Sequence, residues 1–146
     1  GEFQCTPASA RQHYEQRNAS DQHAAHVLQI WLRASRAELG GSLQLQRFTA
    51  AERRGALRVV ASPDGRRGSL RLRGDVFIHS ALLEPGQHVV HELSIGRKSW
   101  LHVLWGEIML ADSILIAGDG AAIEGQNPVS LTARRAAEIV LVDLGA

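Results

Sequence analysis

The strongest constraint on this chain is a succession of short β-type segments that fills the sequence from Leu57 onward. Each segment alternates apolar and polar residues or is rich in Val, Ile and Leu, and turn residues such as Pro63-Asp64-Gly65 separate neighbouring segments. Strands at this spacing, without helical stretches between them, indicate an antiparallel sandwich or barrel. We predict strands at residues 57–61, 70–73, 76–83, 88–95, 99–105, 107–110, 113–116, 118–123, 129–133 and 137–142.

The first third of the chain is organised differently. Residues 26–32 (HVLQIWL) have the composition of a strand, residues 33–41 form a polar connection, and residues 43–48 predict another short strand. These segments are too few to close a barrel of their own. We therefore expect an arm that packs against something else.

The composition narrows the class of protein. A chain of 146 residues with 45% hydrophobic content is long enough for one domain with a core. A net charge of +1 argues against a partner held by a large uniform field, such as bulk nucleic acid or a membrane surface. Cys5 is the only cysteine, no apolar run approaches the ~18 residues of a membrane helix, and the start lacks the regions of a secretion signal. We expect a soluble, cytoplasmic protein with no membrane and no nucleic-acid partner.

Eight arginines between residues 47 and 73 are the densest charged feature. Alternation places Arg71 and Arg73 on a solvent-facing surface, which is the simpler interpretation of the whole set. A docking patch for an acidic partner or nucleic acid is the alternative. The set comprises Arg47, Arg53, Arg54, Arg58, Arg66, Arg67, Arg71 and Arg73.

His13 and Glu15 are candidate metal ligands. In a β-strand, side chains at positions i and i+2 point to the same face, so both could reach one cation. An iron or zinc site normally takes three or four protein ligands. The pair is therefore half of a site, and its other ligands must come from elsewhere.

Several segments together resemble the pirin and quercetinase-like bicupin family, in which two jelly-roll cupin barrels stand in tandem. They are Gly1-Glu2-Phe3-Gln4, His13-Tyr14-Glu15, His26-Val27-Leu28-Gln29-Ile30-Trp31, residues 60–65 and 68–70, and the last strand at 138–144. The resemblance implies an all-β fold, a cupin jelly-roll β-barrel with an N-terminal β arm left from a second cupin. It assigns residues 1–48 to the remnant of the N-terminal cupin and residues 49–146 to a C-terminal cupin barrel.

The resemblance also implies a mononuclear metal, usually iron, bound in the N-terminal cupin by a His-x-His pair, a further histidine and a glutamate. His13 and Glu15 match the last two ligands by position, and Glu15 is also a candidate catalytic base. The His-x-His pair is not in this sequence. The resemblance thus places the pair but does not complete the site.

The C-terminal barrel does not supply the missing ligands. When the cupin motif G-x5-H-x-H-x4-E-x6-G is anchored on Gly86 and Gly106, its ligand positions fall on Glu92, Ser94 and Ser99. The second cupin motif likewise has an alanine at its histidine position. One carboxylate and two hydroxyls do not hold iron or zinc in the usual way. We predict a metal-free barrel.

The other histidines predict structural roles. His88 and His91 are three residues apart, which puts them on opposite faces of a strand, and we expect each to be hydrogen-bonded. His102 falls on the face opposite Ser99, outside the barrel. His79 is isolated in the sequence pattern.

Two functions of different classes remain open. The first is a pirin-like dioxygenase that uses iron, or another divalent metal, on flavonol-type substrates once other ligands complete the site. The second is a binding or regulatory module that recognises a protein partner. For the chain as given we predict no competent catalysis. We also predict a homodimer formed through the N-terminal arm, because Leu28, Ile30 and Trp31 would otherwise be exposed.

Overall fold

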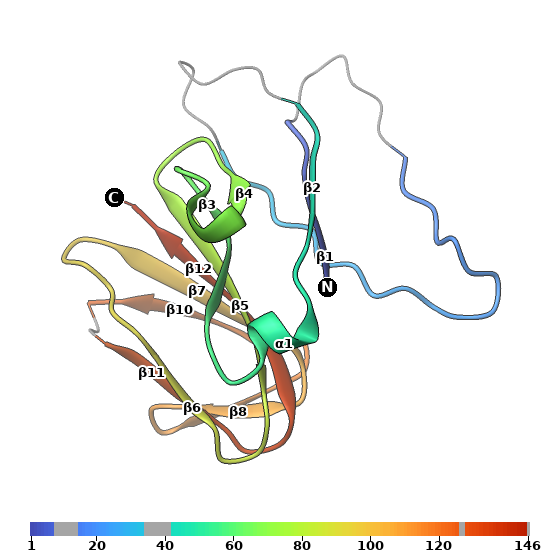
Figure 1. Ribbon diagram of the computed structural model, residues 1–146. Helices are drawn as coiled ribbons and strands as arrows, with labels where there is room; N and C mark the ends of the chain where they lie inside the picture. The colour runs from blue at the N-terminus through green and yellow to red at the C-terminus, as the bar shows by residue number, and fades with distance from the viewer. Residues whose placement is uncertain (8–14, 34–41, 126–127, 146) are drawn as a thin grey trace.

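The computed structural model describes residues 1–7, 15–33, 42–125 and 128–145, and its elements are nearly all strands (Figure 1). A two-stranded sheet forms the arm, with β1 (Glu2–Cys5) and β2 (Gln44–Arg47). A four-stranded sheet has the order β6 (His88–His91), β11 (Val129–Ala133), β8 (Glu107–Leu110) and β9 (Ser113–Ile116). A six-stranded sheet has the order β10 (Gly120–Glu124), β7 (Lys98–Trp105), β12 (Ala137–Leu144), β5 (Val76–Leu83), β3 (Arg58–Ser62) and β4 (Leu70–Arg71). The helix α1 (Ala50–Arg53) and the 3-10 turn η2 (Arg66–Gly68) lie in the connections.

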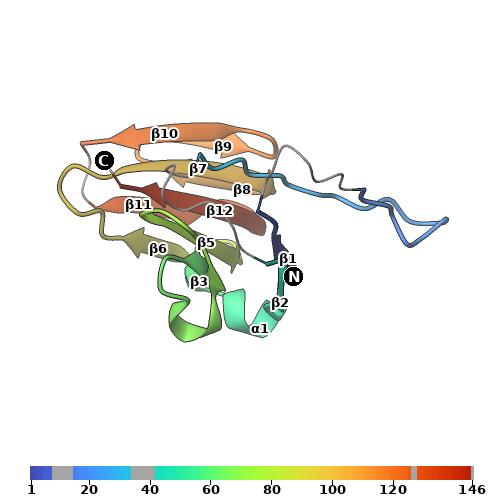
Figure 2. The ribbon, with the colours of Figure 1, turned by 90° about the horizontal axis from the view of Figure 1, so that it is seen from above.

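The six-stranded and four-stranded sheets face each other and enclose the main hydrophobic core (Figure 2). Their strand pairs are antiparallel except β3 with β4. Alternate residues of each strand point inward, as Leu101 and Val103 on β7 and Leu141 on β12 do, and all three are fully buried. Burying such a side chain stabilises the fold by roughly 1.5–3 kcal/mol. The all-β jelly-roll prediction is confirmed.

A second hydrophobic core lies on the outer face of the six-stranded sheet, beneath the arm. Val140 of β12 faces this core, and in it Phe3 of β1 meets Phe48 edge to face, with ring centroids 5.4 Å apart. The side-chain amide of Gln44 pairs with the backbone of Arg71, accepting from its N–H at 2.8 Å and donating to its C=O at 2.9 Å. This pairing joins β2 to the edge strand β4. The arm therefore completes the burial of the outer sheet face.

The predicted strand at residues 26–32 is wrong. These residues form no strand in the structure, and Trp31 is 80% exposed. Leu32 packs against the second core, but the apolar residues before it have no strand beside them to complete a ladder. The strand predicted at residues 88–95 is shorter than expected and ends at His91, where the chain turns toward β7.

The short helix α1 was not predicted, although the sequence carries its start signal. The hydroxyl of Thr49 accepts from the backbone N–H of Glu52, and the carboxylate of Glu52 accepts from the backbone N–H of Thr49 at 2.8 Å. This capping box is encoded by Thr49-Ala50-Ala51-Glu52. No helix in the described ranges, α1 included, is long and apolar enough to cross a membrane.

Two glycines with nearly equal backbone angles offer a matched test of this packing. Gly106 (φ 89°) and Gly118 (φ 91°) both occupy a conformation that disfavours a side chain. A Cβ on Gly106 would overlap the carbonyl oxygen of Ala136 and the backbone of Ala137, whereas a Cβ on Gly118 meets open space. We expect Gly118→Ala to lower the free energy of unfolding by about 1–2 kcal/mol, the cost of positive φ alone. Gly106→Ala should cost about 3 kcal/mol or more, measured by urea denaturation. Equal losses would contradict the tight packing at Gly106.

Candidate functional site

The predicted metal pair is described only in part. His13 lies outside the described residues. The Glu15 side chain is 70% exposed and accepts a hydrogen bond from Arg17 Nε at 2.6 Å. Within residues 1–7, 15–33, 42–125 and 128–145, no group of three or more His, Cys, Asp or Glu side chains is placed to hold a metal ion. The assignment of His13 and Glu15 as metal ligands stays a prediction.

The cupin-motif positions of the barrel do not converge on one point. Glu92 and Ser94 lie in the segment that follows β6 and are exposed to solvent. Ser99 on β7 faces the interior and is buried. A metal ion at the usual cupin position would therefore meet one hydroxyl, with no imidazole or carboxylate from the motif. These residues do not fit an iron, nickel or zinc ion.

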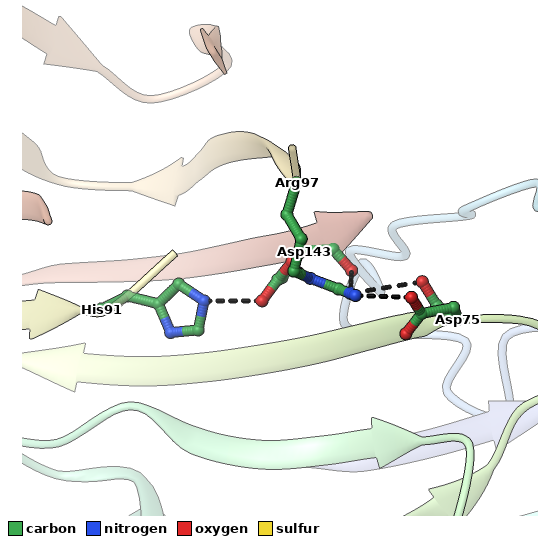
Figure 3. Close-up of polar contacts among 4 residues, drawn as sticks. All are labelled: Asp75, His91, Arg97 and Asp143. Atoms are coloured by element: carbon green, nitrogen blue, oxygen red, sulfur yellow. Dashed lines mark hydrogen bonds and ion pairs between the residues drawn. The ribbon is translucent and has the colours of Figure 1, made fainter. Parts of the chain in front are cut away.

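A network of polar side chains occupies the interior at this end of the barrel (Figure 3). The two carboxylate oxygens of Asp143 accept separate hydrogen bonds, from His91 Nε2 at 2.9 Å and from Arg97 Nε at 2.6 Å. Arg97 also donates from Nη1 to Asp75 at 2.6 Å. The side chains of His91 and Arg97 are each 14% exposed and that of Asp143 is 7% exposed, so the contacts with Asp143 are shielded from water, whereas Asp75 is 64% exposed. Asp75, His79, His91, Arg97 and Asp143 are together named the interior polar cluster.

Strand alternation and register bring the cluster together. On β12, Leu141 points into the core and Asp143 takes the next inward position. Asp143 pairs in register with Ser99 on β7 and with Phe77 on β5. His91 ends β6, which belongs to the other sheet. The hydrogen bond between His91 and Asp143 therefore joins the two sheets across the barrel.

Arg97 is held from several sides. Burial works against its charge, but hydrogen bonds to Asp143 and Asp75 outweigh that effect and raise the pKa of Arg97 above its ordinary value. Its guanidinium carbon also lies 5.3 Å from the ring centroid of Phe77, whose opposite charge distribution attracts a cation. Arg97 is thus a permanent charge that keeps Asp143 in place.

His79 lies against His91, with ring centroids 4.8 Å apart. Burial, reinforced by the neighbouring His91, lowers the pKa of His79 to about 4, so its imidazole is neutral at pH 7. The Nδ1 atom of His79 and the Oγ atom of Ser99 are buried and have no hydrogen-bond partner among the described residues. Each such atom costs roughly 1–3 kcal/mol. Hydrogen bonding at this end of the barrel is therefore incomplete.

The sequence predicted some of these residues and missed others. His91 is buried and hydrogen-bonded as expected, and His88 is exposed and bonds Thr132 Oγ1 at 2.9 Å. His79 is not isolated, because the fold brings β5 beside the end of β6. Asp143 and Arg97 were not singled out. The signal for Asp143 was available, since a carboxylate replaces the apolar residue expected at an inward position of the last strand.

The arginine set divides into different environments. Arg53 is 5% exposed and donates to Ser80 and Glu138, so its assignment to a solvent-facing surface is wrong. Its guanidinium lies over the ring of Phe3, which links α1 to the arm. Arg71 is exposed as predicted. Only part of the set can therefore form a docking surface.

The comparison with protein families identifies the family of the barrel. The family described as the quercetinase C-terminal cupin domain matches residues 59–144, which is more than half of the chain. The chain belongs to this family. The resemblance to pirins and quercetinase-like cupins seen in the sequence is thereby confirmed.

Similar proteins extend this relation beyond the matched domain. The quercetin 2,3-dioxygenase of Escherichia coli (strain K12) is 28% identical over 144 residues, an alignment that covers 99% of this chain and 61% of that protein. The crystal structure of the bacterial pirin YhhW from Escherichia coli, in complex with nickel(II), has a TM-score of 0.66 and 28% identity over 71% of this chain and 44% of that one. YhaK from Escherichia coli has a TM-score of 0.63 and 26% identity over 73% and 47% of the two chains. The chain thus spans about 61% of the length of the quercetin dioxygenase it resembles.

Removing the charge of Asp143 tests whether the cluster supports the barrel. Asp143→Asn leaves Arg97 buried with Asp75 as its one remaining carboxylate, and loss of one member of a buried ion pair costs about 3 kcal/mol. We expect that decrease in the free energy of unfolding at pH 7, measured by urea denaturation. Glu124→Gln is the matched control, because its ion pair with Lys98 is more than half exposed on both sides. It should leave the unfolding midpoint nearly unchanged. Equal effects of the two substitutions would show that the cluster does not stabilise the barrel.

Proposed function

We propose that this chain is the metal-free cupin region of a cytoplasmic, pirin-like protein related to quercetin dioxygenases, and that as given it does not oxygenate flavonols. Its barrel supports and positions other parts of such a protein, while metal chemistry is confined to residues outside the barrel. The family match and the similarity to quercetin 2,3-dioxygenase support the relation. Residues 1–48 are proposed as the end of an N-terminal cupin and residues 49–146 as the C-terminal one.

The observation that carries the proposal is the content of the barrel interior. Where a metal-binding cupin has imidazoles and a glutamate, this chain places Ser99 beside Asp143, and Asp143 is already bound by His91 and Arg97. A carboxylate that accepts two charge-assisted hydrogen bonds is a poor free ligand. The barrel is therefore suited to a structural role.

Metal content and oxygen uptake test this proposal. After incubation with Fe(II) or Ni(II) and gel filtration, the chain should retain well below one equivalent of metal. Quercetin should then cause no oxygen uptake beyond that of the free metal, measured with an oxygen electrode. One equivalent of retained metal with quercetin-dependent oxygen uptake would overturn the proposal.

The dioxygenase alternative has its own signature. If other ligands complete a site, His13 and Glu15 would hold iron or another divalent metal, and the metal would supply Lewis-acid activation of substrate or oxygen. In that case His13→Ala and Glu15→Gln would each remove the retained metal and the activity. His26→Ala is the control, because His26 is exposed and lies outside the predicted pair.

A regulatory role is the second alternative, and the exposed arginines favour it. Arg47, Arg54 and Arg67 are exposed and form no ion pair that the structure records. Binding of an acidic protein partner at this surface should weaken steeply with salt. Charge reversal at Arg54 and Arg67 should then abolish binding.

We also propose that the arm mediates a homodimer. Trp31 is 80% exposed, Leu45 is 67% exposed and Val27 is 57% exposed, and Figure 2 shows residues 15–33, which lie between β1 and β2 in the sequence, projecting away from the two sheets before returning to them. Such side chains are usually covered by a partner. Light scattering at micromolar concentration should give twice the mass of the chain, and Trp31→Ser should give a monomer. Ile95→Ser, at an exposed position in the turn between β6 and β7, should remain dimeric. A monomer for the unaltered chain would contradict the proposal.

A further inference from the structure

The interior polar cluster attaches the segment between β6 and β7 to β12. Residues 92–97 connect β6 to β7, and Ile95 at its tip is fully exposed. Leu93 is buried in the main core, and Arg97 is hydrogen-bonded to Asp75 and Asp143. At the beginning of the segment, His91 is bonded to Asp143. The segment is therefore clasped to β12 at both of its ends, and both attachments use the same carboxylate.

His79 is the group in this cluster whose protonation would weaken the attachment of residues 92–97 to β12. The ring of His91, on β6, lies 4.8 Å from the ring of His79, centroid to centroid. The carboxylate of Asp143, on β12, favours a proton on His79. The positive charge of Arg66, on η2, disfavours a proton on His79. The remaining charged groups of the cluster are Arg97 and Asp75, and Arg97 pairs with both Asp75 and Asp143, each at 2.6 Å. A proton on His79 would thus stand beside a second imidazole in a buried place that holds a single shared carboxylate.

We propose that the interior polar cluster is an acid-sensitive clasp, which closes this end of the barrel at neutral pH and releases residues 92–97 when His79 gains a proton. A buried imidazolium at His79 lacks the solvation that water would give it, and opening the end of the barrel supplies that water. Opening would also expose Ser99 Oγ and His79 Nδ1, the two buried atoms without partners. The released end would present Ser99 and His79 to small polar molecules in solution.

The direction of the pH dependence follows from the state of His79 in the closed barrel. There its pKa is about 4, whereas an imidazole in water titrates near 6.5. The closed form is thus favoured by its neutral His79 above about pH 6.5, and this advantage is lost as the pH falls from about 6.5 toward 4. The open fraction should rise roughly tenfold to a hundredfold between about pH 7 and about pH 4.5.

Amide hydrogen exchange, corrected for the intrinsic pH dependence of exchange, measures this opening segment by segment. We expect protection of residues 92–97 to fall by roughly tenfold to a hundredfold from about pH 7 to about pH 4.5. Protection of the central strands β7 and β12 should change much less. His79→Gln should remove most of the pH dependence, because its amide does not titrate. His88→Gln should retain it, because His88 lies exposed on the outer face of β6.

The inference is overturned if protection of residues 92–97 is the same at both pH values, or if it is lost only together with β7 and β12. It is also overturned if His79→Gln keeps the full response. Should that variant fail to fold, NMR titration of the unaltered chain decides the matter. A His79 ring that titrates near its ordinary pKa contradicts the clasp, and one that stays neutral down to about pH 5 supports it.

Discussion

The structure depends on β12 being buried on both faces. Leu141 and its inward neighbours fill the space between the two large sheets, while Val140 and Val142 are covered from outside by the second core. A central antiparallel strand with both faces dry needs cover on each side, which neither large sheet can supply alone. The arm and α1 provide the outer cover. This explains why a segment before the barrel is built into it by Phe3, Phe48 and the side chain of Gln44.

A carboxylate near each end of β12 binds side chains from neighbouring elements. Near its start, Glu138 accepts from Arg53 of α1 and, at 3.0 Å, from Trp105 Nε1 on β7. Near its other end, Asp143 holds Arg97 and His91. Buried ion pairs contribute little net stability compared with apolar packing, but they admit few alternative arrangements. The apolar middle of β12 therefore supplies most of the stabilisation, and its charged ends fix which elements dock there.

The sequence predicted the barrel well because its strands are short, regularly spaced and punctuated by turns. Residues 76–83 and 113–116 were predicted to the residue, since turn residues on either side mark where such strands begin and end. The strand predicted at residues 26–32 was wrong because a strand forms only beside another strand, and pairing is a long-range property. The interior polar cluster was not predicted, for the same reason. His79 and His91 come together only through a contact between two sheets, which no local pattern encodes.

The position of the cluster shows how charged side chains of the chain itself can hold the end of the barrel together. Inward positions at the barrel end lie close to water, yet they are enclosed enough that an unpaired polar group there is costly. A metal site solves this problem by binding each polar side chain to one cation. Here Arg97 replaces the cation: it is a permanent charge, its pKa raised by Asp143 and Asp75, and it brings the carboxylate of β12 and that of the turn before β5 to one point. Because a guanidinium is fixed to its own chain, this arrangement maintains the barrel but offers no open coordination position for chemistry. The arrangement therefore supports the proposal that metal chemistry is confined to residues outside the barrel interior.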